Sequence, residues 1–272
     1  AGGHSSRAVL VRPRNGMIRR RAALLFASAT SVRGWMSSST SNDGLVSHLV
    51  RDGIVSTPAV EAALRRLDRK HFARAVDEPT RPPDDRTAYA DAPAPIGPMA
   101  TISAPHMHGR CLELLAEPLL RRPAARVLDV GSGSGYLTAA FALLGGGVRA
   151  YGVDRTASLV ELARENVKRD RSLAEALGDR VSFERRDGWT GLPQHGPYDA
   201  IHVGAAAEKI PADLLDQLAI GGRMIIPVGG RADAQALIQI DRRADGEFLQ
   251  KTLFGVRYVE LVDERNLSSG DL

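Results

Sequence analysis

Hydrophobic and polar positions alternate in two ways along this chain of 272 residues. From about residue 126, short continuous apolar runs are separated by segments whose apolar residues recur at helical spacing. Such runs predict buried strands joined by helices, which is typical of a parallel sheet covered on both faces. The expected strands are RVLDVG, VRAYGVD, VSFERRD, YDAIHVGA and RMIIPVG, and the expected helices lie near residues 136–144, 156–169 and 211–218.

Upstream of these strands the pattern is first helical and then irregular. The apolar positions of residues 45–50 share one helical face, and Thr57 followed by Pro58 predicts a second helix with a hydroxyl cap and a first-turn proline. The solvent side of that helix is expected to carry the sequence RRLDRK, residues 65–70. Residues 77–98 hold six of the fifteen prolines, which predicts a long irregular loop and excludes a regular element of any length.

The end of the chain predicts a different arrangement. Residues 234–261 contain no helix-length insert, and the sequence ADGE separates two strand-like runs. This pattern predicts an antiparallel hairpin at the sheet edge. The expected fold is therefore α/β, with a doubly wound, mostly parallel seven-stranded sheet, an N-terminal helical subdomain and a C-terminal antiparallel hairpin.

The formal net charge of +4 is unevenly distributed. Residues 1–42 contain no acid and carry +7, so the other 230 residues carry −3. An arginine-rich, acid-free N-terminal segment is typical of an organelle transit peptide. A disordered basic tail, sequence upstream of a start at Met36 and the charged beginning of a secretory signal are the alternatives. The seven basic residues are Arg7, Arg12, Arg14, Arg19, Arg20, Arg21 and Arg33.

Composition and charge limit the function classes. With 43% hydrophobic residues the chain can form a full core, and it has no apolar run near the roughly 20 residues that span a bilayer. The charge of −3 outside the arm argues against a nucleic-acid partner. The single cysteine, Cys111, excludes a disulfide framework and favours a reducing compartment. We therefore expect no membrane partner and a location in the cytoplasm, or in a mitochondrion or plastid if the arm is a transit peptide. We also expect a monomer.

The most informative segment is VLDVGSGSGYLTAAFA, residues 127–142. A buried strand ends at Val130, and glycines at every second position then allow a tight turn and a close approach to a ligand. The dinucleotide-binding fingerprint has a further glycine at the position that Tyr136 occupies here. Asp129, just before the turn, places a negative charge beside it. A cationic cofactor, S-adenosylmethionine, fits that charge. The turn comprises Gly131, Ser132, Gly133, Ser134 and Gly135.

Two further acids end later strands. Asp154 follows YGV, where a carboxylate can accept hydrogen bonds from ribose hydroxyls. Its alternative role is that of a solvated acid capping the next helix. Asp187 and Gly188 end the third strand, where an acid commonly meets an adenine edge.

The segment PMATISAPHMHGRCLELL, residues 98–115, offers hydroxyls and histidines. Ser103 and His106 suggest a nucleophile with a base, yet no orienting acid or nucleophile-elbow pattern accompanies them. His106 and His108 lack an evident third ligand, so no metal site is expected.

At these residues the chain resembles the protein L-isoaspartate (D-aspartate) O-methyltransferases, particularly the eukaryotic form. The resemblance runs from about Leu45 to about Asp263. One departure is Val262, which follows YVEL where the family commonly has threonine after YVPL. The matching segments are ATISAPHMH, LDVGSGSGYLTA, YDAIHVGAAA, DQLAIGGRMIIPVG and GVRYVEL.

The resemblance implies a Rossmann-like, class I S-adenosylmethionine methyltransferase domain over residues 43–272. Residues 43–110 would form the helical, substrate-side part and residues 111–272 the cofactor-binding core. The implied reaction methylates the α-carboxylate of L-isoaspartyl residues, with D-aspartyl residues as a further substrate, and begins the repair of damaged proteins. A methyltransferase of the same fold acting on a small molecule, and a cofactor-binding regulator without turnover, are the alternatives.

The resemblance places the catalytic hydroxyl on Ser103. The acceptor carboxylate is already ionised at neutral pH and needs no general base, so Ser103 is expected to orient it. The substrate peptide is expected to lie extended against residues 99–104. Together, the residues and the resemblance place the cofactor on Ala100, Thr101, Ile102, Ser103, His108, Asp129, Gly131, Ser132, Gly133, Ser134, Gly135, Asp154, Arg155, Ser158, Asp187 and Gly188.

Overall fold

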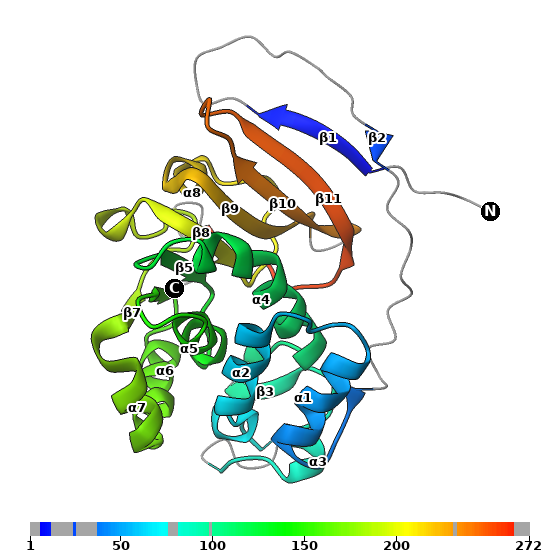
Figure 1. The fold of residues 1–272 in the computed structure, drawn as a ribbon, viewed down its shortest axis with the longest axis vertical. Helices are drawn as coiled ribbons and strands as arrows, with labels where there is room; N and C mark the ends of the chain where they lie inside the picture. The colour runs from blue at the N-terminus through cyan, green and yellow to red at the C-terminus, as the bar shows by residue number, and fades with distance from the viewer. Residues whose placement is uncertain are drawn as a thin grey trace, which may run out of the picture.

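A twisted sheet runs through the centre of the molecule (Figure 1). The computed structural model describes residues 6–11, 24–25, 37–75, 81–97, 100–230 and 233–263, and within these residues the sheet has nine strands. Their spatial order is β2 (Leu24–Leu25), β1 (Ser6–Val11), β11 (Phe248–Val256), β10 (Gln235–Arg242), β9 (Leu218–Val228), β8 (Tyr198–Val203), β5 (Arg126–Val130), β6 (Arg149–Asp154) and β7 (Val181–Arg185).

Helices and a small second sheet complete the described elements. The second sheet pairs β3 (Ala94–Gly97) with β4 (Ala100–Ile102). The helices are α1 (Asn42–Arg51), α2 (Pro58–Arg66), η2 (Arg69–Phe72), α3 (Asp85–Ala88), α4 (Pro105–Leu120), α5 (Tyr136–Leu143), α6 (Ala157–Arg169), α7 (Arg171–Leu177), η3 (Gly178–Arg180), η4 (Pro193–His195) and α8 (Ala212–Asp216).

The predicted α/β fold is confirmed. Strands β7, β6, β5, β8 and β9 are mutually parallel, and β10 and β11 add the predicted antiparallel hairpin. Two strands of the arm, β1 and β2, were not predicted. β1 pairs antiparallel with β11, whose outer edge offers unpaired backbone groups to a further strand.

Alternate side chains of the central strands enter two hydrophobic cores, one on each face of the sheet. Val127 and Ala200 belong to the core under α4 and α5, whereas Leu128 and Ile201 belong to the opposite core with Trp189. All six residues of β8 are buried. The strands therefore need apolar side chains on both faces, which explains their continuous hydrophobic runs.

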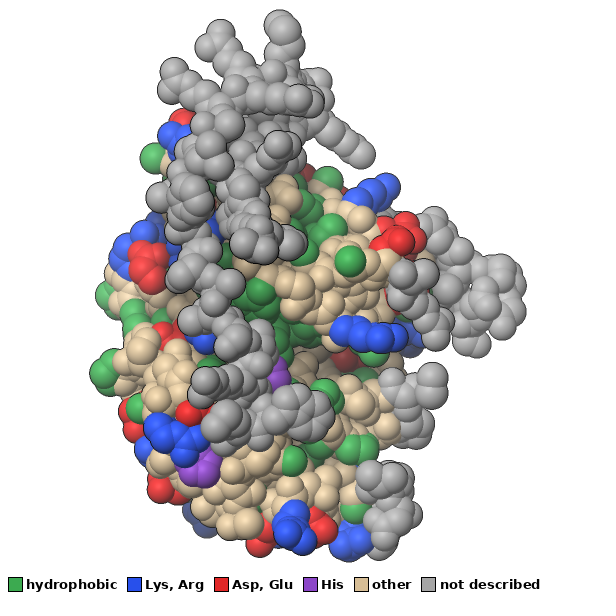
Figure 2. All heavy atoms as spheres, turned by 90° about the vertical axis from the view of Figure 1, so that its right-hand side faces the viewer, with side chains coloured by type: hydrophobic (Ala, Val, Ile, Leu, Met, Phe, Trp, Pro, Cys, Tyr) green, Lys and Arg blue, Asp and Glu red, His purple; other side chains and the backbone are tan. Residues whose placement is uncertain are grey.

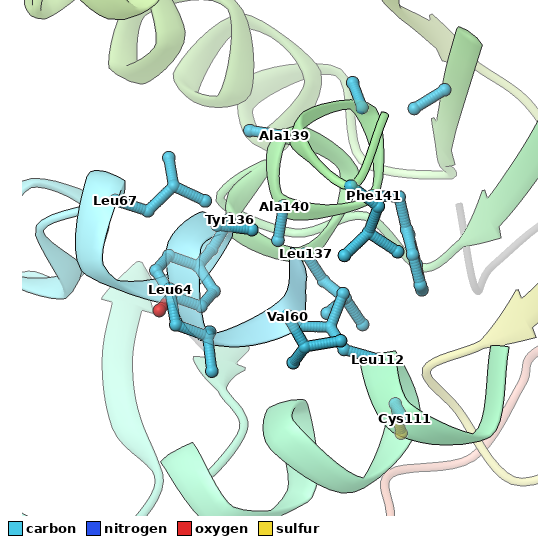
Figure 3. Packing of buried hydrophobic residues seen from close by; sticks show 14 of the residues in the cluster. Val60, Leu64, Leu67, Cys111, Leu112, Tyr136, Leu137, Ala139, Ala140 and Phe141 are labelled. Atoms are coloured by element: carbon cyan, nitrogen blue, oxygen red, sulfur yellow. The ribbon is translucent and has the colours of Figure 1, made fainter. Parts of the chain in front are cut away.

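The N-terminal helices share the first of these cores with the sheet. Figure 3 shows Val60, Leu64 and Leu67 from the α2 region facing side chains of α4 and α5, among them Leu112 and Tyr136. The expected division at residue 110 falls inside α4. The helical part and the α/β part thus pack as one body around a common core.

Two local expectations were wrong. The proline-rich segment contains the four-residue elements α3 and β3, because Asp84 caps α3 and Pro95 lies in a two-stranded ribbon that does not need its N–H. The sequence RRLDRK does not lie on a solvent face. Since α2 ends at Arg66, the following residues turn inward and Leu67 and Arg69 are fully buried.

The cap of α2 also differs from the expectation. The Thr57 hydroxyl does not cap its own helix. Instead, the Glu113 carboxylate of α4 accepts bonds from both backbone N–H groups and both hydroxyls of Ser56 and Thr57, at 2.8–3.1 Å. One carboxylate therefore ties the start of α2 to the middle of α4.

We expect Glu113→Ala to lower the free energy of unfolding by about 2 kcal/mol at neutral pH, because four donors lose a charged acceptor. Burial alone would raise the pKa of Glu113, but the bonds from Ser56 and Thr57 outweigh it and lower that pKa. The contribution is therefore present above the unfolded-state pKa and is lost as pH falls through the folded-state pKa. Urea unfolding at several pH values measures it.

Glu117→Ala is the matched control, because Glu117 lies on the same helix, is exposed and pairs only with Arg121 in the bonds described for it. Its cost should stay within about 0.5 kcal/mol. Equal costs for the two variants would contradict the role given to Glu113.

Candidate active site

A pocket opens where β5 and β8 end, at the carboxyl edge of the parallel strands, the usual ligand position in such sheets. It holds about 390 Å³ of empty space, including its open mouth. Its lining comes from the β3–β4 ribbon, α4, the glycine turn after β5, the start of α5 and the end of β8. The residues are Ile96, Thr101, Ile102, Ser103, His108, Asp129, Gly131, Ser132, Gly133, Ser134, Tyr136, Leu137, His202 and Gly204.

The glycine turn needs its glycines for conformation. Gly131, Gly133 and Gly135 have φ values of 76°, 52° and 82°, which disfavour any residue with a Cβ. A Cβ on Gly135 would also lie 2.9 Å from the Phe183 ring. The Ser132 hydroxyl is buried in the pocket lining and has no partner in the described residues. The unpartnered Ser132 hydroxyl, beside the backbone of the glycine turn, is suited to bind a polar group of a cofactor.

Asp154, at the end of β6, supports this turn from outside the lining. Its carboxylate accepts bonds from the N–H of Gly133 at 3.1 Å and of Thr156 at 2.9 Å. It is buried, and burial raises its pKa. Asp154 is therefore not a solvated acid, although its bond to Thr156 does hold the start of α6. Arg155 and Ser158 are exposed and lie outside the lining.

Asp187 and Gly188 follow the end of β7. Asp187 accepts a bond from the Trp189 N–H at 2.9 Å. A Cβ on Gly188 would lie 2.7 Å from Val130 and 2.8 Å from Leu261, so this glycine allows close packing. Neither residue is part of the lining.

Asp129 forms the floor of the pocket with two partners that the sequence reasoning missed. Its Oδ1 lies 2.7 Å from Nδ1 of His202, and its Oδ2 accepts a bond from the Thr138 hydroxyl at 2.5 Å. Burial would lower the pKa of His202, but the bonds to Asp129 and Cys111 raise it to about 10. His202 is therefore an imidazolium at neutral pH. Contrary to the expectation from the sequence, Asp129 does not present a bare negative charge to a cation, because the Asp129–His202 pair carries no net charge.

The substrate side centres on Ser103, which is half-buried at the pocket wall. The phenol of Tyr258 interacts with the hydroxyl of Ser103 and the thiol of Cys111, and burial raises the pKa of that phenol. The Gln235 amide holds the Tyr258 backbone through two bonds, of 2.6 and 3.2 Å. The chain end thus brings a second hydroxyl to Ser103, a residue that only the segment GVRYVEL could have indicated.

The two histidines of the substrate segment have different surroundings. His106 has an acid partner that the sequence did not reveal, because its Nδ1 lies 2.8 Å from the Asp91 carboxylate. His106 is not part of the pocket lining that contains Ser103. His108 lines the pocket, stacks on Tyr136 at 5.0 Å between ring centroids and lies 3.5 Å from a guanidinium nitrogen of Arg69. Among the described residues no group of three metal-ligating side chains occurs.

Nine of the expected site residues line one pocket, which the sequence could not establish. They are Thr101, Ile102, Ser103, His108, Asp129, Gly131, Ser132, Gly133 and Ser134. Outside the lining lie Ala100, Gly135, Asp154, Arg155, Ser158, Asp187 and Gly188. The lining residues that the sequence reasoning did not name as site residues are Ile96, Tyr136, Leu137, His202 and Gly204.

One face of the molecule is mixed in charge. On the described part of the face in Figure 2, Lys and Arg side chains alternate with Asp and Glu and form no large patch of one sign. In the part of the chain that the structure describes, no helix is long and apolar enough to cross a membrane.

A glycine turn after the first parallel strand of a doubly wound sheet, with a buried carboxylate at the next strand tip, is shared by dinucleotide-binding proteins and class I S-adenosylmethionine-dependent methyltransferases. The absence of a further glycine at Tyr136 favours the methyltransferases. Residues 40–266 match the sequence profile of the protein-L-isoaspartate(D-aspartate) O-methyltransferase (PCMT) family. The chain belongs to this family.

Individual relatives of the chain belong to the same family. A protein-L-isoaspartate O-methyltransferase of Triticum aestivum is 47% identical over 221 residues, which are 81% of this chain and 90% of the relative. Protein-L-isoaspartate O-methyltransferase 1 of Arabidopsis thaliana is 42% identical over 86% of this chain and 97% of its own. A Plasmodium falciparum structure assigned as a beta-aspartate methyltransferase, bound to S-adenosyl-L-homocysteine, has a TM-score of 0.69 and 32% identity over 82% of this chain and 98% of that one.

The expected enzyme class, cofactor and reaction are thereby confirmed: the chain is an S-adenosylmethionine-dependent methyltransferase for L-isoaspartyl residues of proteins. The departure at Val262 lies outside the pocket lining.

Proposed function

We propose that the pocket carries out this methyl transfer with Ser103 as the hydroxyl that orients the isoaspartyl α-carboxylate. The supporting observation is that Ser103 and the glycine turn line the same pocket. The acceptor and the cofactor can therefore meet inside it. D-aspartyl residues, which the family name includes, are proposed as a further substrate.

The cofactor is proposed to lie along the glycine turn, with the Ser132 hydroxyl and the Asp154 carboxylate as polar contacts. The unpartnered hydroxyl of Ser132 and the buried carboxylate of Asp154 support this assignment. When bound, S-adenosylmethionine supplies an electrophilic methyl group on a sulfonium. The neutral Asp129–His202 pair places no net charge beneath it.

The protein's part in the reaction is alignment rather than proton transfer. The α-carboxylate has a pKa near 3.5 and is ionised at neutral pH. The Ser103 hydroxyl donates to one carboxylate oxygen and leaves the other free to receive the methyl group. Alignment of this kind can supply roughly 7–11 kcal/mol of the barrier.

The substrate peptide is proposed to lie extended beside β4. Among the described strands β4 pairs only with β3, and Thr101 is exposed at the pocket rim. Main-chain bonds to such an edge accept many sequences, whereas the position of the carboxylate distinguishes isoaspartate from aspartate. Misplacing a hydrogen-bonded carboxylate costs more than the roughly 1–3 kcal/mol of one methylene.

We also propose that the enzyme acts as a monomer without a nucleic-acid or membrane partner, and that residues 1–42 form an arm that precedes the methyltransferase domain and adds β1 to the edge of its sheet. The charge of −3 on residues 43–272 argues against a nucleic-acid partner. The seven arginines of the arm support delivery to a mitochondrion or plastid; without such delivery the location is the cytoplasm.

The full chain, incubated with methyl-labelled S-adenosylmethionine, should label an isoaspartyl peptide and leave the matched aspartyl peptide unlabelled. The label should be released by mild base, because it is a methyl ester. Equal labelling of both peptides, or of neither, would contradict the proposal. A D-aspartyl version of the same peptide tests the further substrate.

A further inference from the structure

Arg69 is a fully buried cation behind the wall of the pocket. One guanidinium nitrogen lies 3.5 Å from Nδ1 of His108, and another donates to the Ala92 carbonyl at 3.2 Å. Its Nε has no partner in the described residues, and its exposed fraction is 0%. Burying an arginine without a bonded carboxylate is costly, so its position calls for a functional reason.

The direction of the bond to His108 follows from chemistry. A guanidinium has only donors, so Nδ1 of His108 must accept and cannot carry a proton. A neutral imidazole with an unprotonated Nδ1 carries its proton on Nε2. No residue that the structure describes bonds to Nε2, and His108 is part of the pocket lining.

We propose that Arg69 is a positioning residue that holds His108 in the neutral Nε2–H tautomer, so that the histidine always offers a hydrogen-bond donor to a carboxylate in the pocket. This rests on the proposed function, which brings two carboxylates there: the isoaspartyl α-carboxylate and that of the cofactor's methionyl part. In the other tautomer Nε2 would be an acceptor and would repel either one.

The surroundings of His108 keep it neutral. It faces the Arg69 guanidinium of η2, the Tyr136 ring of α5, His106 of its own helix and the His202 imidazolium of β8. Burial, and then the charge of Arg69, lowers the pKa of His108 well below its ordinary value. The nearby carboxylate of Asp91 bonds to His106 instead.

The tautomer can be measured without activity, by nitrogen NMR of ¹⁵N-histidine-labelled full-length protein. We expect Nδ1 of His108 to be unprotonated and Nε2 protonated in the wild type, and this preference to be lost in Arg69→Met. Arg242→Met is the control, because Arg242 bonds to Leu218 and stacks on Phe248 outside the pocket lining. A protonated Nδ1 in the wild type, or an unchanged tautomer in Arg69→Met, would overturn the proposal.

Binding measurements distinguish which of the two carboxylates accepts the bond from His108. Arg69→Met should weaken binding by about tenfold or more, seen in the KM of the isoaspartyl peptide if the substrate is held, or in the Kd of S-adenosylhomocysteine if the cofactor is held. No change in either constant would overturn the role. If the tautomer is observed and Arg69→Met weakens S-adenosylhomocysteine binding, but the wild type does not methylate the isoaspartyl peptide, only the proposed function is refuted.

A second variant, His108→Gln, tests the proposal in a way that does not depend on whether Arg69→Met alone is stable. In His108→Gln the side-chain amide donates whether or not Arg69 is present. Adding Arg69→Met to His108→Gln should therefore leave the affected constant unchanged. The same tenfold loss in that background would show that Arg69 acts through another route.

Discussion

Replacing Ser103 by alanine is expected to lower kcat/KM for an isoaspartyl peptide by about 100-fold, because a hydrogen bond to a charged group and the alignment that it enforces are both lost. The Kd of S-adenosylhomocysteine should stay within about twofold, since the glycine turn, Ser132 and Asp154 are untouched. Steady-state methylation assays and calorimetric titration measure the two quantities.

Two further variants make this result specific. Ser103→Thr keeps a hydroxyl and should recover part of the activity. Ser182→Ala removes a buried hydroxyl of β7 that has no partner in the described residues and lies outside the pocket lining, so activity should stay unchanged. Turnover that survives Ser103→Ala intact would refute the orienting role.

Replacing His202 by leucine is expected to lower the free energy of unfolding by about 3–5 kcal/mol, because the buried Asp129 carboxylate loses its charge partner. Asp129 is 1% exposed and keeps only its bond from Thr138 among the contacts described here. Combining the change with Asp129→Asn removes the stranded charge and should recover part of the loss. Chemical denaturation of the three proteins measures this.

The Asp129–His202 pair also makes the free energy of unfolding depend on pH in a defined direction. The pKa of His202 rises from about 6.5 in an unfolded chain to about 10 in the folded protein. A raised pKa stabilises the fold fully below pH 6.5, and this stabilisation is lost as pH rises towards 10. The stability difference between wild type and His202→Leu should therefore shrink between pH 7 and pH 10. A difference that stays constant over this range would show that His202 is neutral in the folded protein.

The sheet and the glycine turn were predictable because each depends on local sequence. Strands buried on both faces must be continuously apolar, and a turn with three positive φ values must be rich in glycine. Residues 127–142 contain both signals in one stretch. The prediction there was correct in strand, turn and helix.

The rest of the site depends on residues that are far apart in the sequence. His202 is a polar residue inside an apolar strand, and nothing near it identifies Asp129 as its partner. Arg69 lies in a basic stretch that fits an exposed helix face, and it is buried only because α2 ends three residues earlier. Tyr258 lies beside Ser103 and its backbone is held by the Gln235 side chain. No local pattern encodes either contact.

The contact between Tyr258 and Ser103 also bears on how the enzyme is made. Ser103 and Tyr258 are separated by most of the catalytic domain, and Tyr258 follows β11, which pairs with β10. A ribosome releases the N-terminal part first, so Ser103 and the glycine turn emerge long before Tyr258. The pocket is therefore complete as a working site only when nearly the whole chain has emerged.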